Sequence, residues 1–222
     1  MKIAILGGTG NEGAGLGFRW AAAGHEVIIG SRSAEKGQDA AAATQAKLPQ
    51  ATISGGDNAF AAEQGDIVVL SVPYAAQEAT LATPGVSEAV QDKILITVVA
   101  PLGDPKARVW RLPSGLSAAE EAQQQLGENV RVVAAFQNIS AGHLRDLDHE
   151  LDCDVLVCGA KAADKDIVIQ LCADAGMRGI NAGALANAAV AEGLTAVLLG
   201  INIRNKIYNA GIRITGLPEG SR

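Results

Sequence analysis

Aromatic residues are scarce in this chain: Phe, Trp and Tyr together make up 3% of its 222 residues. Proteins that bind nucleic acids combine a basic surface with aromatic side chains on which bases stack. This sequence has a formal net charge of −6 and no basic tract. Both shortages argue against a nucleic-acid partner.

Cysteine is also rare, and the three present are Cys153, Cys158 and Cys172. An odd number cannot pair completely, and their spacing matches no zinc pattern. We therefore expect buried thiols in a reducing, cytoplasmic compartment, and no metal site.

Long apolar runs are missing as well. The stretch at residues 194–203 is the longest, and Gly200 and Asn202 interrupt it. A bilayer-spanning helix needs about 20 consecutive apolar residues. The apolar N-terminus reaches a glycine turn too early for a signal peptide. The sequence therefore predicts no membrane segment.

Short apolar runs rich in Val and Ile alternate with Ala-rich segments over the first two thirds of the chain. This alternation is typical of a parallel sheet that is covered by helices on both faces. We expect strands at residues 2–6, 26–30, 51–54, 66–73, 93–99, 130–136 and 154–159. We expect helices at residues 14–23, 34–47, 77–90, 118–126, 163–175 and 186–206, with Pro84 as the candidate interruption of the third. The fold class is thus α/β.

A glycine-rich turn follows the first expected strand. Gly8, Gly10 and Gly13 fit the pattern G-x-G-x-x-G at the start of a βαβ unit, which is the context that a dinucleotide-binding turn requires. In that motif the first glycine makes the tight turn, the second lets the backbone approach a pyrophosphate, and the third lets helix and strand pack closely. We therefore predict a Rossmann-type parallel sheet domain at residues 1–140, followed by a small C-terminal α/β domain at residues 141–222.

The end of the second expected strand indicates which dinucleotide binds. A site for NAD usually carries Asp or Glu here, whereas this chain has Ser31 and Arg32, with Lys36 one turn later. A hydroxyl, a guanidinium and an ammonium attract the 2′-phosphate of NADP, and charge-assisted hydrogen bonds contribute about 1.5–3 kcal/mol each. The pattern favours NADP. Glu12 is unexpected, because it adds a negative charge beside the phosphates.

No catalytic group stands out. His25 precedes a strand, His143 and His149 lie in a polar segment, and we find no nucleophile motif or carboxylate pair. Hydride transfer between two organic rings depends more on holding the rings close together and excluding water than on acid–base catalysis. Ligands of such sheets bind beyond the carboxyl ends of the strands. That edge comprises residues 9–13, 71–76, 99–102 and 136–141.

Several stretches resemble the NADPH-dependent reductases of the deazaflavin coenzyme F420, over nearly the whole chain. They are LGGTGNEG, GHEVIIGSRSAEK, AFQNISA, NAGALANAAVAEGLTAVLLGIN and NAGIRITGL, and the last is the most selective. The resemblance implies reversible hydride transfer between NADP and coenzyme F420 without metal, in a homodimer. Gln137 stands where some members carry His; an amide there could hydrogen-bond a ring carbonyl.

The resemblance also implies site residues by position. Those for the dinucleotide are Thr9, Gly10, Asn11 and Glu12 at the pyrophosphate, Ser31, Arg32 and Lys36 at the 2′-phosphate, and Val72, Ala76, Ala100, Leu102 and Ala141 along its length. Ala210 would meet the deazaflavin through its backbone. We also expect Arg204, Lys206 or Arg213 to face the anionic tail of that coenzyme.

Two other functions fit the same dinucleotide site. A reductase of a small acceptor such as a cyclic imine would need a proton donor between residues 137 and 149. A non-catalytic NADP sensor would bind the cofactor without transferring hydride. The apolar helix expected at residues 186–206 is predicted to serve both as core and as a subunit interface.

Overall fold

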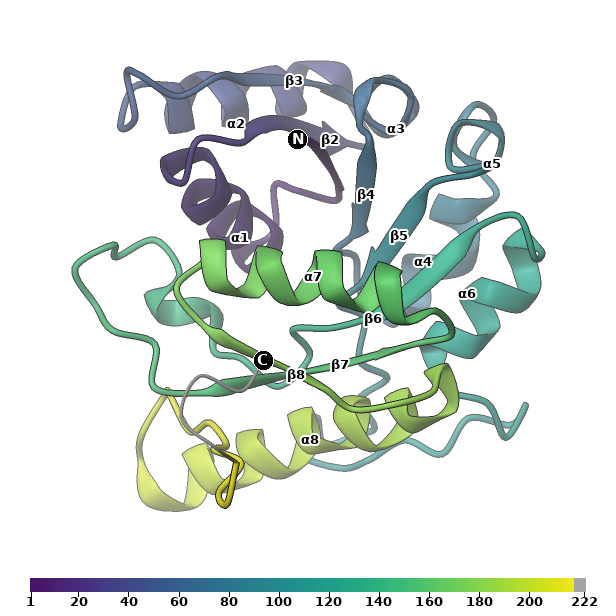
Figure 1. Cartoon of the computed structure of the whole chain (residues 1–222), viewed down its shortest axis with the longest axis vertical. Coiled ribbons are helices and arrows are strands. Elements are labelled where there is room, and N and C mark those ends of the chain that lie inside the picture. Colours follow the sequence, from purple (N-terminus) through teal and green to yellow (C-terminus); the bar gives the residue numbers. More distant parts are fainter. Residues whose placement is uncertain (218–222) are drawn as a thin grey trace.

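The structure is a computed structural model that describes residues 1–217. Within this part of the chain, one sheet has the strand order β3-β2-β1-β4-β5-β6-β7-β8 (Figure 1). The strands are β1 (Lys2–Leu6), β2 (Glu26–Ser31), β3 (Ile53–Asp57), β4 (Ile67–Leu70), β5 (Ile94–Thr97), β6 (Arg131–Ala134), β7 (Asp154–Gly159) and β8 (Arg178–Asn181). The order reverses between β1 and β4, and this switch point creates the crevice in which open α/β sheets bind ligands.

Helices cover both faces of the sheet. They are α1 (Asn11–Ala22), α2 (Ala34–Gln45), α3 (Asn58–Gln64), α4 (Tyr74–Leu81), α5 (Val86–Ala89), α6 (Ala118–Leu126), α7 (Ala162–Asp174) and α8 (Ala188–Asn205), with short 3₁₀ turns at Ala141–His143 and Leu185–Asn187. The α/β class and the Rossmann-type arrangement expected from the sequence are confirmed.

Alternate residues of each central strand belong to different cores, because successive side chains point to opposite faces. On β1, Ile3 and Ile5 join the core beneath α1, α2 and α7. Ala4 and Leu6 join the core beneath α3 to α6. All four are fully buried, which explains why these strands read as continuous apolar runs.

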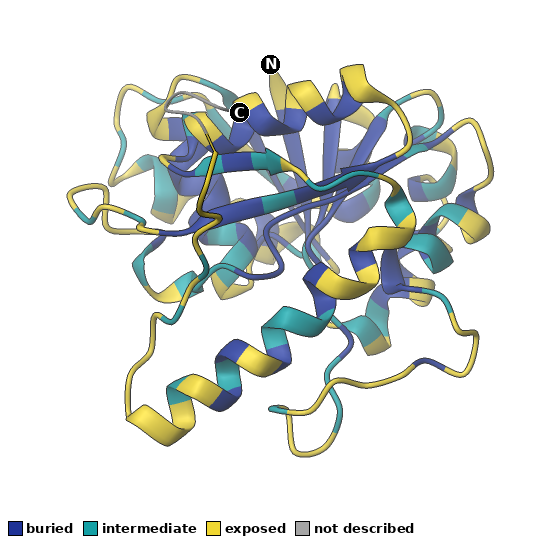
Figure 2. Cartoon of the chain, turned by 60° about the horizontal axis from the view of Figure 1, so that its bottom comes forward, coloured by how far each residue is buried: buried dark blue, intermediate teal, exposed yellow. Residues whose placement is uncertain are grey.

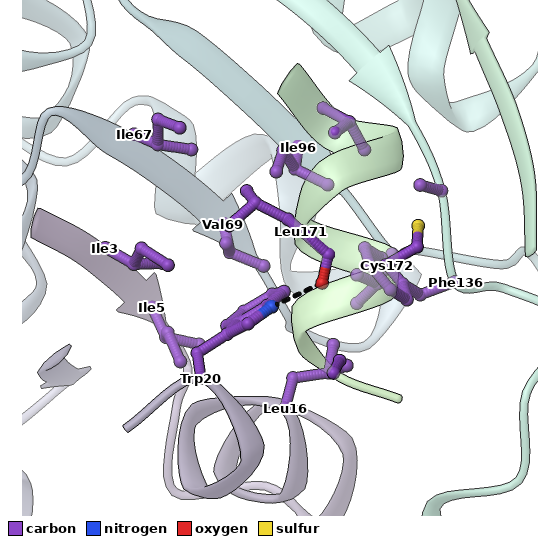
Figure 3. Close-up of a cluster of buried hydrophobic side chains, with 14 of the residues drawn as sticks. Ile3, Ile5, Leu16, Trp20, Ile67, Val69, Ile96, Phe136, Leu171 and Cys172 are labelled. Carbon is purple, nitrogen blue, oxygen red and sulfur yellow. Dashed lines mark hydrogen bonds between the residues drawn. The ribbon is translucent and has the colours of Figure 1, made fainter. Parts of the chain in front are cut away.

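The larger core is joined across the fold by Trp20 of α1. Its indole Nε1 donates a 2.9 Å hydrogen bond to the carbonyl oxygen of Leu171 in α7 (Figure 3). Its ring also meets Phe136, just beyond β6, edge to face at 5.7 Å. The C-terminal half of the chain thus packs directly on the first helix.

Two elements differ from the sequence-based expectation. The strand β8 and the short helix α3 were not anticipated, because neither contains a long apolar run. The helix expected at residues 77–90 is divided into α4 and α5 around Pro84, the residue expected to interrupt it, since proline disfavours helical backbone in the preceding residue.

The sheet does not end at residue 140. β7 pairs with β6 in antiparallel direction, through Val133 with Gly159 and Ala134 with Cys158, and β8 then continues parallel to β7. The C-terminal unit therefore extends the same sheet. The proposed division at residue 140 stays a prediction.

The long helix α8 packs on α6 and β7 at one side of the molecule (Figure 1). Exposed and buried residues alternate along it, as the long helix at the lower front of Figure 2 shows. Among the described residues, the helical stretch Leu185–Asn205 is long and apolar enough to cross a membrane by length and composition. Buried Glu192 within it nevertheless accepts hydrogen bonds from the amides of Ala118 and Ala119 at 2.9 and 3.0 Å, which fixes α8 to the first turn of α6.

Candidate active site

The turn after β1 is built from glycines that leave no room for side chains. Gly7 has a φ of +72°, and a Cβ added there would lie 2.5 Å from the carbonyl oxygen of Ser71. A Cβ at Gly8 would lie 2.9 Å from the oxygen of Ile5, and one at Gly13 would lie 2.8 Å from Ser71 Oγ. The motif had suggested that Gly8 makes the tight turn, but the residue with a left-handed backbone is Gly7. Gly13 lets α1 pack against the end of β4, as expected.

The first turn of α1 offers free backbone amides. Gly10 precedes the helix in an extended conformation and makes no side-chain capping bond. Beside it, Glu12 has a buried carboxyl oxygen, Oε1, without a hydrogen-bond partner in the structure described. Burial raises the pKa of Glu12 to about 8, so the carboxyl is neutral at pH 7. A neutral acid does not repel a phosphate and can donate a hydrogen bond to it.

A cavity of about 550 Å³ opens between this turn, the end of β2 and the end of β4. It brings together predicted residues from all three segments: Thr9, Gly10, Ser31, Arg32, Lys36, Val72 and Ala76. Several other predicted residues do not line it: Asn11, Glu12, Ala100, Leu102, Gln137, Ala141 and Ala210. The cavity therefore corresponds to the adenosine and phosphate part of a dinucleotide site.

Positive charge gathers at one end of the cavity. Ser31 is the last residue of β2 and is buried, whereas Arg32 and Lys36 are exposed. Neither cation forms a salt bridge within residues 1–217. The acid nearest in the sheet register, Asp57, instead accepts a 2.8 Å hydrogen bond from the amide of Phe60. Both cations are thus available to an anion.

Sequence reasoning missed the polar residues Ser33, Asn58 and Thr80 of this cavity. Asn58 is buried at the start of α3, lines the cavity, and accepts a 3.2 Å hydrogen bond from the amide of Gly7 through Oδ1. It therefore supports the glycine turn from the first residue of α3, 51 residues further along the chain. No local pattern marks it, because its role depends on the pairing of β3 with β2.

Gln137 follows β6 and is almost fully buried. Its side-chain Nε2 donates to the carbonyl oxygen of Thr97 at 2.9 Å. Its backbone carbonyl oxygen accepts from Thr195 Oγ1 of α8 at 2.7 Å. Its side-chain Oε1 has no partner in the part of the chain that is described. The free atom is thus an acceptor, so Gln137 is placed to receive an N–H, and not to donate to a ring carbonyl as the sequence had suggested.

The C-terminal tail folds back beside the segment that follows β6. The carbonyl oxygen of Tyr208 accepts a 2.9 Å hydrogen bond from Ser140 Oγ. The amide of Ala210 donates to Asn202 Oδ1 at 3.0 Å. A cavity of about 290 Å³ lies between these segments, with Ala210 and Ile139 among its lining residues. The tail therefore lies next to the region of Gln137.

Asp154, the first residue of β7, holds the tail in place. Its carboxylate accepts two hydrogen bonds from Arg178, at 2.8 and 2.6 Å, and one from the amide of Ile214 at 2.6 Å. The Arg178 guanidinium is the main reason that the pKa of Asp154 is lowered. Arg213, expected near an anionic ligand, already pairs with Asp152 at 3.1 Å. Arg204 and Lys206 are exposed near the end of α8.

Residues 2–101 match the family described as NADP oxidoreductase, coenzyme F420-dependent. The chain is 45% identical to the F420-dependent NADP reductase of Methanothermobacter marburgensis, over 99% of this chain and 100% of that protein. It is 43% identical to the protein of the same name from Methanocaldococcus jannaschii, over 98% and 99% of the two chains.

Solved structures agree in fold. A candidate F420-dependent NADP-reductase from Arthrobacter sp. FB24 has a TM-score of 0.82 and 28% identity, over 97% of this chain and 100% of that one. A pyrroline carboxylate reductase from Plasmodium falciparum has a TM-score of 0.51 and 16% identity, over 82% of this chain and 58% of that one, and shares the fold alone. Identity above 40% along the full length decides the assignment: the chain belongs to the family of F420-dependent NADP reductases.

Proposed function

We propose that this protein transfers a hydride reversibly between NADP(H) and coenzyme F420. The observation that carries the proposal is the cavity in which a glycine turn with free amides meets two unpaired cations, Arg32 and Lys36, in a chain that is 45% identical to an F420-dependent NADP reductase. Purified protein mixed with NADPH and oxidised coenzyme F420 should bleach the visible band of the deazaflavin. If the band does not bleach, the assignment of coenzyme F420 as the acceptor is wrong, but the assignment of the dinucleotide site still stands.

The residues around the glycine turn fit a bound pyrophosphate. Gly10 has open space where a Cβ would stand, its nearest neighbour being the carbonyl oxygen of Gly7 at 3.4 Å. Thr9 and Asn11 then present backbone amides at the positive end of α1, while the Gly10 amide already donates to the carbonyl oxygen of Gly7 at 3.0 Å. Glu12, kept neutral by burial, does not repel the phosphate. Ser31, Arg32 and Lys36 bind the 2′-phosphate.

When bound, NADP supplies the carbon that gives or receives the hydride, and the protein supplies position and dryness. Val72, Ala76, Ala100, Leu102 and Ala141 have side chains that can line the dinucleotide with apolar surface. Gln137 Oε1 accepts a hydrogen bond from an N–H of one of the two rings. We assign no acid or base of the chain to the reaction: the hydride passes directly between two ring carbons, and the proton that a deazaflavin nitrogen takes up with it comes from solvent.

The deazaflavin is proposed to bind against the C-terminal unit, residues 141–222, where the backbone of Ala210 contacts it. Support comes from the tail itself, which hydrogen bonds fix on both sides of Ala210: Ser140 donates to the carbonyl oxygen of Tyr208, and the amide of Ile214 donates to Asp154. The amide of Ala210 itself donates to Asn202 Oδ1. A backbone held on both sides is a rigid surface for a planar ligand. The two alternatives have no comparable support, since the imine reductase shares the fold only and a sensor needs no second ligand site.

We propose a cytoplasmic homodimer formed through α8. Several large apolar side chains on this helix are exposed although they belong to an ordered element: Val190, Val197, Ile201 and Ile203. A second copy of the chain would bury them, and the hydrogen bonds of Glu192 show that the opposite side of the helix already packs on α6. A solution mass of one chain at micromolar concentration would contradict the dimer.

A further inference from the structure

Three side chains that the proposed hydride transfer does not use converge on one point, beside the cavity that Ala210 also lines. His143, Asp146 and His149 each offer a ligand atom, and these atoms all lie within 4.8 Å of one another. The two imidazole rings stack with centroids 3.8 Å apart and planes at 16°. In the sequence these residues lie three apart in a polar segment and show no familiar ligand pattern.

A single buried guanidinium holds the backbone beneath all three. Arg19 Nη2 donates to the carbonyl oxygens of His143, Asp146 and His149, at 3.3, 2.7 and 3.1 Å. Arg19 Nε also donates to the carbonyl oxygen of Leu144 at 3.0 Å. Arg19 is only 7% exposed. The three candidate ligands are thus attached to one fixed point in the core.

Packing makes the same segment rigid. Leu144 is fully buried against α1, and a Cβ added at Gly15 would lie 2.5 Å from Leu144 Cβ. Asp146 Oδ1 accepts a 3.2 Å hydrogen bond from the amide of Asp148, which orients the carboxylate. Its other oxygen, Oδ2, has no hydrogen-bond partner in the described structure and is free to bind a ligand. The segment is therefore a pre-organised carrier for these side chains.

We propose that His143, Asp146 and His149 bind one divalent transition-metal ion of the Zn²⁺ type. Two imidazole nitrogens and a carboxylate oxygen are a donor set that Zn²⁺ accepts, at about 2.0–2.2 Å from each atom. The ligand atoms already lie within 4.8 Å of one another, but an N–Zn bond lies in the plane of its imidazole, so at least one ring must turn out of the stacked arrangement to bind the ion. The proposed hydride transfer uses none of the three side chains.

The surroundings add one acid and leave a coordination position open. Both histidines line the cavity of about 290 Å³, together with Glu150. Asp152 lines it too, but its carboxylate already pairs with Arg213 at 3.1 Å. Asn209 and Gly211 of the C-terminal tail form its other wall. A bound ion would therefore stand between residues 141–150 and the tail, with its fourth position facing the cavity. Cys153 lines the same cavity but is not among the three converging groups.

Isothermal titration of untagged, chelator-treated protein with Zn²⁺ tests the site without either coenzyme. We expect one ion per chain. His143→Ala, His149→Ala and Asp146→Asn should each weaken binding at least tenfold, since even the loss of an outer-shell partner costs about 10- to 100-fold. Zn²⁺ should also raise the melting temperature of the unsubstituted protein.

Asp148→Asn is the matched control. It removes the same charge from the same segment, but its side chain is not among the three converging groups, so binding should be unchanged. Circular dichroism of each metal-free variant verifies folding, and His143→Gln replaces any variant that does not fold. Absence of stoichiometric uptake would overturn the site, and so would equal weakening by Asp148→Asn. Because bleaching of the deazaflavin is measured separately, either result leaves the proposed reaction untouched.

Discussion

Asp154 and Arg178 form a two-point ion pair, with distances of 2.8 and 2.6 Å, that joins the first residues of β7 and β8. The same pair holds the tail, because Asp154 accepts from the amide of Ile214 and Arg178 donates to its carbonyl oxygen at 2.9 Å. A buried carboxylate thus connects the sheet to the segment proposed to meet the deazaflavin.

Removing the guanidinium should release the tail. Arg178→Ala is expected to lower the free energy of unfolding by about 2 kcal/mol, less than for a fully buried pair because Arg178 is partly exposed. It should raise the Michaelis constant for coenzyme F420 and leave the affinity for NADPH unchanged. Arg131→Ala is the control, since it breaks the Arg131–Asp164 pair far from the tail. An equal effect of both variants on the Michaelis constant would contradict the role of the tail.

The same ion pair gives a pH dependence. Because the pKa of Asp154 is lowered from its usual 3.8, its stabilising contribution is present above about pH 4 and is lost as the pH falls further. Acid unfolding of Asp154→Asn followed by circular dichroism should therefore show a shallower loss of stability below pH 4 than the unsubstituted protein.

Arg32 is expected to decide between NADP and NAD. Arg32→Ala should weaken NADPH binding at least tenfold, because it removes a charge-assisted hydrogen bond worth about 1.5–3 kcal/mol. NADH binding should change little, since NADH has no 2′-phosphate. Lys47→Ala, which removes an exposed cation just beyond the far end of α2, is the control. Fluorescence titration measures both affinities, and equal losses for NADPH and NADH would refute the assignment.

Glu12 should make cofactor binding sensitive to alkaline pH. Its pKa of about 8 means that the neutral form is present below pH 8 and is lost as the pH rises through that value. The dissociation constant for NADPH should accordingly increase between pH 7 and 9.5. Glu12→Gln keeps a hydrogen-bonding group that does not ionise. The dissociation constant of this variant for NADPH should therefore not change over this pH range. The same increase in both proteins would show that another group titrates.

Gly7 should tolerate no side chain. Gly7→Ala combines a left-handed backbone with a Cβ at 2.5 Å from the oxygen of Ser71, and we expect a loss of about 3 kcal/mol or more in unfolding free energy. Gly24→Ala is the matched control, because Gly24 has a φ of +89° but no atom within 4 Å of an added Cβ. It should cost only about 1 kcal/mol. The free energies of unfolding of the two variants, measured in urea, separate the cost of the left-handed backbone from the cost of the steric clash with Ser71.

Much of the dinucleotide site could be predicted from the sequence because its signals are local. The glycines lie within one turn, and Ser31, Arg32 and Lys36 follow a strand whose apolar residues identify it. Strands buried on both faces, such as β1 and β4, can be predicted equally well, because their apolar residues are continuous. These features depend on neighbours a few residues away.

The remainder depends on contacts between distant segments. β8 has the sequence RGIN, in which a single large apolar residue gives no strand signal. The antiparallel direction of β7 follows from how residues 138–152 pack on α1, where Arg19 binds carbonyl groups more than 120 residues away. The convergence of His143 and His149 has the same origin. No pattern within that segment could have indicated it.

The most direct measurement follows a deuterium atom from NADPH that is labelled at the transferred position. If the two rings meet in a dry cleft between the glycine turn and the C-terminal tail, the label should appear in the reduced deazaflavin without dilution, in ordinary water. Deuterium found in the solvent, with protium in the reduced ring, would contradict direct transfer.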